Sequence, residues 1–404
     1  MISLEEALQH VTDGVTALPS ELVSISEAHG RVLAEDVASR FTQPPAAVSS
    51  MDGYAVIASD TTASPACLTL IGESAAGGCF DGTVKNGQTV RIFTGAPLPD
   101  GADAVVMQEN TERDGETVKI LEGVETGNFI RPAGMDFKEG DVMLPKGRQL
   151  SARDIGLAAA MNRPWLTVTR KPRIAVLATG NEVVMPGEPV GPNQILSSNS
   201  LSVSAMVRAF GGDPINLGIA KDDEDSLHLM VAGAQKADLL VTIGGASVGD
   251  YDLVQKVLGE EGLKLDFYKV AMKPGKPLIF GHVKETPVLG LPGNPVSANV
   301  TGLIFLRAAM EVMLGQPSTG LATTTAELVV DVPENGPRQE FMRATLEKNE
   351  AGDWTVNPFK AQDSALLARL ASADCLVIRP PNATSAKAGE RVEIMHLPKG
   401  IMSF

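Results

Sequence analysis

The stretch that decides the fold is Arg173–Gly180, RIAVLATG, a continuous apolar run that ends in a Thr-Gly pair. An amphipathic helical pattern follows over 199–212, and 216–220 predicts a second strand. The alternation continues with a helix over 225–237, strands over 237–245 and 287–291, and a long helix over 294–314. Because alternating buried strands and helices form a mostly parallel sheet covered on both faces, this region predicts a three-layer α/β domain.

The sequence on either side of this region has a different periodicity. Apolar residues recur at helical spacing over 4–15 and again over 22–28, which predicts two helices. Short alternating runs separated by Gly, Pro and Asp occupy about 67–121 and indicate a small β domain, before helical spacing returns over 148–163. A β domain between helical segments suggests an insertion into one elongated domain. After Gly315, alternating runs predict a closing all-β domain.

Composition excludes several classes of protein. The 404 residues include 34 Lys and Arg against 49 Asp and Glu, a net charge of −15 that opposes binding to nucleic acid. The 3 Cys and 5 His show none of the spacings of a disulfide framework, a zinc finger or an iron–sulfur cluster. The N-terminus is acidic and amphipathic, and no run of about 18 residues lacks a charge or Asn. We therefore expect a cytoplasmic protein without a membrane segment.

Polar residues follow the predicted strands. Glu182, in the sequence TGNE, can coordinate a hard cation or orient a ligand, although a helix N-cap or a solvated turn explains it equally. In the loop 243–252, three Gly and a Ser allow backbone N–H groups to approach an anion, and Asp250 and Asp252 suit a shared Mg²⁺. The alternative for this loop is a tight turn capped by Asp. The glycines of the loop 243–252 have neither the spacing of a P-loop nor that of a dinucleotide-binding motif.

Rigid loops rich in Pro come next. The stretch 273–277, KPGKP, fixes two Lys in an acidic chain and is typical of an oxyanion clamp, the alternative being a solvated basic turn. The stretch 291–297, LPGNPVS, leads into a helix whose free N–H groups can face an anion. By themselves, 50–55 (SMDGYA) and 93–99 (FTGAPLP) indicate turns, and Asp222-Asp223 indicates a helix cap.

The order of these motifs is informative: SSMDGYA, FTGAPLPDGADAVV, TGNEV, GGASVGDYD, KPGKP and GLPGNPVS. The series resembles the molybdopterin molybdenumtransferases, known as MoeA in bacteria and as the gephyrin E domain in animals. The resemblance covers nearly the whole chain. It implies a central α/β molybdopterin-binding domain, an elongated domain with an inserted small β domain, and a C-terminal β-barrel-like domain. On this sequence those domains correspond to 173–317, to 1–45 with 140–172, to 46–139 and to 318–404.

The resemblance also implies an activity and partners. Members of the family insert molybdate into adenylated molybdopterin, with Mg²⁺-dependent cleavage of the phosphoanhydride and release of AMP. They work as homodimers whose active site is shared between subunits. Transient contact with the molybdopterin adenylyltransferase and with molybdoenzyme maturation proteins would follow.

Site residues are implied by position in the family motifs. Glu182, Asp222 and Asp252 would bind Mg²⁺ or order the pterin and phosphates. Lys269, Lys273, Lys276, Pro292 and Pro295 would hold molybdate and the departing phosphate. Asp52, Thr94 and Asp136 would reach the pocket from the partner subunit. Further substrate contacts would come from Thr179, Gly180, Gly244, Gly245, Ser247, Gly293, Asn294 and Ser297.

The sequence departs from the family at two places. Asn181 stands where many members have Asp, which removes one charge beside Glu182 and lowers the expected metal affinity. The stretch 362–365, QDSA, replaces a Gly-Ser-Gly-like loop. Two alternatives remain: an adenylyltransferase built on the same α/β module, which would consume ATP, and a scaffold, which would show no molybdate-dependent AMP release. The flanking SMDGYA and TGAP motifs argue against the first, and the catalytic acids against the second.

Overall fold

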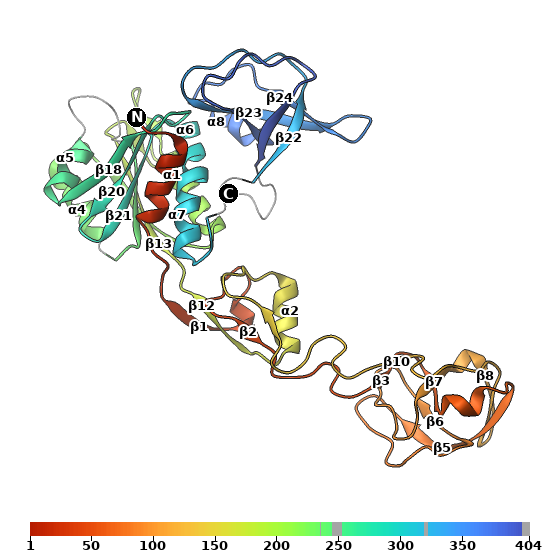
Figure 1. Cartoon of the computed structure of the whole chain (residues 1–404). Helices are drawn as coiled ribbons and strands as arrows, with labels where there is room; N and C mark the ends of the chain where they lie inside the picture. Colours follow the sequence, from red (N-terminus) through yellow and green to blue (C-terminus); the bar gives the residue numbers. More distant parts are fainter. Residues whose placement is uncertain (235, 245–252, 319–321, 398–404) are drawn as a thin grey trace.

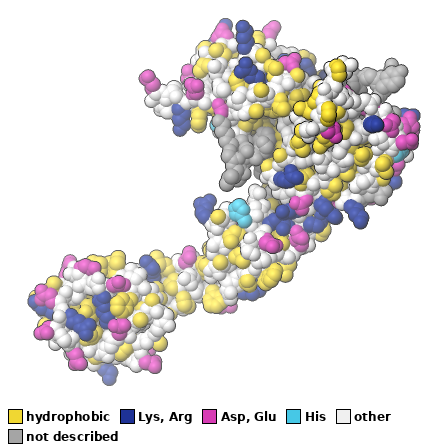
Figure 2. All heavy atoms as spheres, turned by 180° about the vertical axis from the view of Figure 1, so that it is seen from behind, with side chains coloured by type: hydrophobic (Ala, Val, Ile, Leu, Met, Phe, Trp, Pro, Cys, Tyr) yellow, Lys and Arg dark blue, Asp and Glu magenta, His cyan; other side chains and the backbone are white. Residues whose placement is uncertain are grey.

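The protein is elongated, with an α/β body and a small barrel at one end and a separate β domain at the other (Figure 1). The computed structural model describes residues 1–234, 236–244, 253–318 and 322–397. A narrow segment containing a two-stranded ribbon connects the two ends. Figure 2 shows this outline from behind, with acidic and basic side chains interspersed over the distal domain.

A six-stranded sheet forms the centre of the α/β body. In spatial order its strands are β16 (Asp213–Ala220), β13 (Arg173–Thr179), β17 (Leu239–Ile243), β21 (Thr286–Leu291), β20 (Pro277–Val283) and β18 (Leu263–Lys269). The first four run parallel, and β20 is antiparallel to both of its neighbours. The mostly parallel sheet predicted from the sequence is confirmed, and so is the strand over Arg173–Thr179 that decides it.

Helices cover both faces of this sheet. One face carries α1 (Leu4–Asp13), α3 (Ser198–Ala209), α6 (Pro295–Thr301) and α7 (Arg307–Met313), and the other carries α4 (Glu224–Gly233) and α5 (Leu253–Glu260). Helix α1 comes from the start of the chain, yet Ala7 and Val11 are fully buried in the same apolar core as Ile174. The three layers are therefore completed by a segment about 170 residues away in sequence.

The long helix predicted over 294–314 is continuous from α6 to α7 through a π-helical turn, Gly302–Leu306. Among the described residues, Pro295–Met313 is the helix long and apolar enough to span a bilayer, and 83% of that window is buried within the protein. Such burial is what a core helix requires.

The narrow segment is built mainly from paired strands. It contains β1 (Ser20–Ser24) paired with β12 (Trp165–Thr169), β2 (Val37–Ala38) paired with β11 (Val142–Leu144), the 3₁₀ turn Ile25–Glu27 and α2 (Ala152–Ala160). The helix predicted over 22–28 is therefore wrong. Leu22 lies opposite Thr167 in an antiparallel ladder. Three apolar residues at intervals of three are too few to establish a helical period, and the pairing with a strand distant in sequence determines the conformation instead. The helix behind Ser151 is confirmed, with a capping box.

The distal domain is a second six-stranded sheet. Its strands in spatial order are β7 (Ala104–Met107), β4 (Gly53–Val56), β6 (Gln88–Ile92), β5 (Ala66–Ser74), β9 (Thr117–Ile120) and β8 (Thr111–Asp114), with β3 (Val48–Ser49) paired to β10 (Ile130–Arg131) beside it. Two 3₁₀ turns, Ala58–Thr61 and Gln108–Asn110, also belong here. The alternating runs between 67 and 121 are strands, as predicted. The SMDGYA motif begins with a bend over 50–52, and its last three residues are the first residues of β4.

The C-terminal domain is a closed five-stranded barrel. Its strands are β22 (Thr323–Leu328), β23 (Gln339–Lys348), β24 (Trp354–Pro358), β25 (Cys375–Arg379) and β26 (Arg391–His396), and closure comes from β23, which pairs with both β24 and β25. The short helix α8 (Leu367–Ala371) lies between β24 and β25. Strand β19 (Met272–Lys273) of the α/β body pairs with β23 and connects the two parts. The expected barrel-like domain is confirmed, while the exact domain limits stay predictions.

A partly buried ion pair joins the ribbon to the α/β body. Arg170 follows β12, and its Nη1 and Nη2 donate to the two carboxylate oxygens of Asp238, each at 2.8 Å. The Arg173 N–H donates to the same carboxylate at 2.7 Å. Burial alone would raise the pKa of Asp238, but these hydrogen bonds outweigh it and hold that pKa below its usual value.

We expect Asp238→Ala to lower the free energy of unfolding of the α/β body by about 3 kcal/mol, because Arg170 loses its carboxylate in a partly buried position. The matched control is Asp213→Ala, which breaks a 3.9 Å contact to Lys171 between exposed side chains and should change the free energy of unfolding by under about 0.5 kcal/mol.

The contribution of Asp238 to stability depends on pH. Since folding lowers the pKa of Asp238, this contribution is complete above about pH 4. It disappears as the pH falls through the folded-state value. The free energies of unfolding of wild type and Asp238→Ala, measured in urea between pH 7 and pH 3, should therefore approach each other as the pH falls.

Candidate active site

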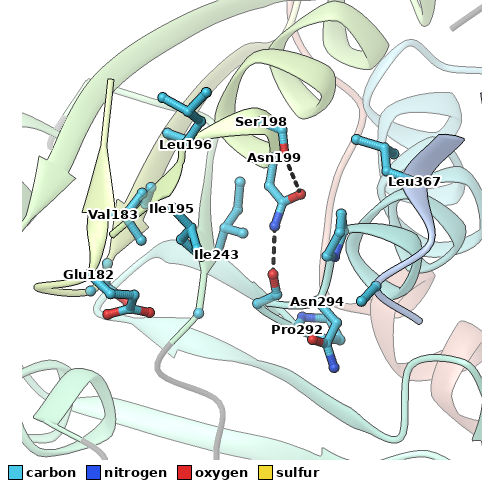
Figure 3. Close-up of a pocket in the computed structure, with 18 of the residues that line it drawn as sticks. Glu182, Val183, Ile195, Leu196, Ser198, Asn199, Ile243, Pro292, Asn294 and Leu367 are labelled. Carbon is cyan, nitrogen blue, oxygen red and sulfur yellow. Dashed lines mark hydrogen bonds between the residues drawn. The ribbon is translucent and has the colours of Figure 1, made fainter. Parts of the chain in front are cut away.

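A cavity of about 990 Å³ among the described residues lies at the carboxyl ends of the parallel strands. Its walls come from the ends of β13, β17 and β21 and from the turn after β16, which are neighbours in the sheet. The lining residues that matter below are Thr179, Gly180, Glu182, Asp222, Gly244, Pro292, Gly293, Asn294 and Pro295 (Figure 3). Open α/β sheets bind ligands at this edge, so the geometry brings most of the predicted strand-end residues into one site.

Small residues and an unpaired hydroxyl form the floor of the pocket. Gly244 has a φ of +91°, and a Cβ placed there would lie 3.0 Å from the carbonyl oxygen of Thr179. Gly293 packs directly beside Gly244, where a Cβ would be 3.6 Å from the Gly244 Cα. Thr179 is only 6% exposed, and its hydroxyl has no hydrogen-bond partner within the described part of the chain. A buried hydroxyl in a polar pocket is stabilised when a ligand atom pairs with it.

The two acids of the pocket are held by adjacent loops. The Glu182 carboxylate lies over Gly180, close enough that a Cβ there would meet Oε2 at 2.7 Å. Asp222 is fixed by a reciprocal pair of 3.2 Å hydrogen bonds: its Oδ2 accepts from the Asn181 N–H, and its own N–H donates to the Asn181 Oδ1. An Asp at 181 would accept the same bond, so this departure from the family keeps the link between the two loops. The cap predicted from Asp222-Asp223 is made by Asp223, which accepts from the Ser226 N–H at 2.7 Å.

These acids suit a hard cation. Glu182 and Asp222 line one pocket, and a carboxylate pair combined with ligand phosphates is the usual environment of Mg²⁺. Within the described ranges no cluster of three His, Cys, Asp or Glu residues is close enough to form a complete metal site. The third expected ligand, Asp252, lies outside the described residues, as do Gly245 and Ser247.

The LPGNP loop forms the opposite wall and is anchored by a residue that the sequence did not single out. Asn199, near the start of α3, donates from Nδ2 to the Gly293 carbonyl at 2.7 Å (Figure 3). The only sequence signal was its place at the start of the helix predicted over 199–212, after the first strand-end loop. Pro295 begins α6, with Asn294 at the N-cap position. Ser297 is buried within α6 and is not part of the lining.

The three expected lysines lie outside this lining. Lys273 pairs with Glu340 of the barrel at 2.8 Å, and the ammonium of Lys269 lies 4.9 Å from the centre of the Tyr268 ring. Lys276 is exposed, next to Pro277, which does line the pocket. Of the three, Lys273 lies at the boundary between the α/β body and the barrel.

The barrel contributes to the pocket through the loop after β24, which the sequence flagged only as a departure. Ala365 and Leu367 line the cavity, and the Ser364 carbonyl accepts from the Val296 N–H at 3.0 Å. Gln362 holds the base of this loop, because its Nε2 donates to the Arg343 carbonyl at 2.9 Å. Arg343 itself is fully buried, and this burial lowers the pKa of its guanidinium.

The remaining predicted residues lie together in the distal β domain, at the other end of the molecule (Figure 1). Asp52 Oδ1 accepts from the N–H and the hydroxyl of Thr94, at 2.7 and 2.8 Å. These two hydrogen bonds hold the pKa of the Asp52 carboxyl below its usual value. Asp136 lines a second cavity of about 770 Å³ that also includes Gly95, next to Thr94. Within one chain, this group and the strand-end pocket are separate.

The chain is similar to known proteins over nearly all of its length. Three family models match: the MoeA N-terminal region (domains I and II) over residues 2–162, a probable molybdopterin-binding domain over 175–311, and the MoeA C-terminal region (domain IV) over 325–397.

Relatives named molybdopterin molybdenumtransferase include one from Nostoc, 35% identical and covering 94% of this chain and 89% of its own length. Another, from Haemophilus influenzae, is 33% identical and covers 98% of both chains. The solved structure of a molybdopterin biosynthesis MoeA protein from Pyrococcus horikoshii superposes with a TM-score of 0.85 at 32% identity and covers 99% of this chain and 100% of its own. The chain therefore belongs to the molybdopterin molybdenumtransferase (MoeA) family.

Proposed function

We propose that this protein completes the molybdenum cofactor, by inserting molybdate into adenylated molybdopterin with cleavage of the phosphoanhydride and release of AMP. The observation that carries the proposal is the strand-end pocket. It combines two carboxylates, a glycine floor and a buried hydroxyl without a partner in the described chain, in a protein of this family. Its volume of about 990 Å³ is at the upper end of the range for small-molecule sites, as a ligand with two ring systems requires.

The residues of the chain bind and orient the anionic centre of this substrate. Gly244 and Gly293 leave room for a phosphate to approach the backbone, and the Thr179 hydroxyl donates to one of its oxygens. Lys273, at the boundary with the barrel, and Lys276, next to Pro277 of the pocket lining, neutralise molybdate and the departing phosphate. Each charge-assisted contact of this kind contributes roughly 1.5–3 kcal/mol.

Glu182 and Asp222 would hold Mg²⁺, which when bound supplies positive charge to the phosphate oxygens. Asn181 fixes Asp222 through the paired hydrogen bonds between the two loops. Separating two linked anions requires charge neutralisation more than a strong base. This requirement fits a pocket whose described lining contains acids, hydroxyls and amides but no His.

We also propose that the protein acts as a cytoplasmic homodimer, receiving its substrate through transient contact with the adenylyltransferase. In one chain the Asp52–Thr94 pair and Asp136 are remote from Glu182, so a second copy would have to supply them to the pocket. Such exchange is natural in a two-fold dimer, where each contact occurs twice.

The direct test is AMP release from adenylated molybdopterin, measured with and without molybdate and Mg²⁺. We expect release that requires both. Consumption of ATP in the presence of unadenylated molybdopterin would instead identify an adenylyltransferase. A protein that releases no AMP under any of these conditions would be a scaffold.

Thr179→Val should weaken binding without weakening the fold. Valine has nearly the same shape, and the lost hydroxyl has no partner among the described residues, so we expect the urea midpoint to stay within error or to rise. Affinity for the adenylated substrate should fall roughly tenfold, because one hydrogen bond to an anion is lost. The control is Thr242→Val. Thr242 lies on the neighbouring strand β17, and its side chain is buried but does not line the pocket. Equal affinities in wild type and Thr179→Val would remove the hydroxyl from the site.

A further inference from the structure

One wall of the strand-end pocket is apolar and comes mainly from the connection between β13 and α3. Two short strands, β14 (Val183–Val184) and β15 (Ile195–Leu196), pair in parallel and line the cavity. Ile195 is 57% exposed and Leu196 is 49% exposed, so two large neighbouring aliphatic side chains are open to the cavity. Leu367 of the barrel helix α8 faces them from the other side of the cavity (Figure 3).

This wall has a fixed position relative to the acids. The Ile195 N–H donates to the Glu182 carbonyl at 2.8 Å, and the Ser197 N–H donates to the Val184 carbonyl at 2.8 Å. The backbone that carries the exposed Ile195 side chain is therefore hydrogen-bonded to Glu182, the residue expected to bind Mg²⁺. A ligand that fills the pocket must carry a charged centre beside Glu182 and an apolar face one strand away.

We propose that Ile195, Leu196 and Leu367 form a clamp, here called the aliphatic clamp, that holds the flat pterin ring system of the substrate. The inference rests on the proposed function. It commits to the pterin because the β14–β15 arm lies within residues 175–311, the part matched as a probable molybdopterin-binding domain. The described lining contains no aromatic side chain, and the apolar side chains that it places beside the acids are aliphatic.

The chemistry of the clamp agrees with this occupant. Ile195 and Leu196 lie on one side of the cavity and Leu367 on the other, and contact with a flat ring removes their exposed apolar area from water. The substrate has a second flat ring, adenine, at the other end of its diphosphate. The clamp binds one of the two, and AMP and molybdopterin carry one ring each, so they separate the two cases.

The experiment compares the double variant Ile195→Ser/Leu196→Ser with the control Val190→Ser in the full-length protein. Val190 is 51% exposed on the same connection and does not line the pocket, so its loss matches the change in surface hydrophobicity. Molybdopterin binding is followed anaerobically by pterin fluorescence, and AMP binding by calorimetry. We expect the double variant to lose roughly tenfold or more in affinity for molybdopterin and to keep its affinity for AMP. Leu196→Met should retain wild-type binding, because it keeps an apolar side chain of similar size.

Three other outcomes would overturn the inference. A loss of AMP affinity with molybdopterin unchanged would assign the clamp to adenine. Unchanged affinity for both, in a double variant with the wild-type urea midpoint, would show that the wall holds no ring. If the wild type bound neither molybdopterin nor AMP, the proposed function itself would fail, and the clamp with it.

Discussion

Neither Asp52→Ala nor Glu182→Ala is expected to release AMP from adenylated molybdopterin, yet co-expression of the two chains should restore about one quarter of wild-type activity. Asp52 lies in the distal β domain and Glu182 in the strand-end pocket, at opposite ends of the elongated molecule (Figure 1). If a dimer combines Asp52 of one subunit with Glu182 of the other, a hybrid dimer carries one site with both substitutions and one intact site. Random pairing makes about half of the dimers hybrids, each half active, which gives the quarter.

The matched control pairs two variants from the same side of the site. Co-expression of Asp52→Ala with Thr94→Ala leaves every site defective, since both residues belong to the distal group, joined by 2.7 and 2.8 Å hydrogen bonds. Differently tagged chains allow hybrid dimers to be purified and assayed alone. Purified Asp52→Ala/Glu182→Ala hybrids without activity would show that the two residues do not act across a subunit interface.

Gly244→Ala should lower kcat/KM for AMP release by roughly 100-fold, about 2.7 kcal/mol of transition-state binding. The added Cβ would lie 3.0 Å from the Thr179 carbonyl oxygen and 3.1 Å from the Thr179 hydroxyl oxygen. The methyl group would therefore occupy the floor of the pocket and displace the hydroxyl assigned to the phosphate.

The control for backbone strain is Gly187→Ala. Gly187 has a φ of +98°, close to the +91° of Gly244, but nothing lies within 4 Å of a Cβ placed there. Both substitutions should cost about 1–2 kcal/mol in stability, because L-residues disfavour this region. Activity should fall only for Gly244→Ala. A comparable loss of kcat/KM in Gly187→Ala would attribute the effect to backbone strain instead of to the space above Gly244.

Much of the architecture was predictable because it depends on local periodicity. The run Arg173–Thr179 is a buried parallel strand, and the alternating runs after Gly315 are the five barrel strands. The failure at 22–28 has the opposite cause. There the ladder with β12, more than 140 residues away in sequence, determined the conformation, and a short apolar pattern contains no information about such a partner.

The site shows the same division. Glu182, Gly244 and the LPGNP loop were found because polar residues after buried strands collect at one edge of a parallel sheet, whereas the residues alone indicated only a helix cap for Asp222 and its place in the site came from the family resemblance. Asn199 and Leu367 were missed. Asn199 reaches Gly293 across 94 positions of sequence, and Leu367 comes from another domain, so no spacing links either to the pocket.

By itself the sequence determined most of the strands and helices and the edge of the sheet where a ligand binds, because each depends on the periodic burial of neighbouring residues. The tertiary structure alone decided which polar groups have partners. It left the Thr179 hydroxyl unpaired among the described residues, bound the Asp52 carboxylate to Thr94 42 positions away, and placed that pair far from Glu182. Such pairings are contacts between segments remote in sequence. A local hydrophobic pattern indicates whether a residue is buried, but it does not indicate which residue contacts it.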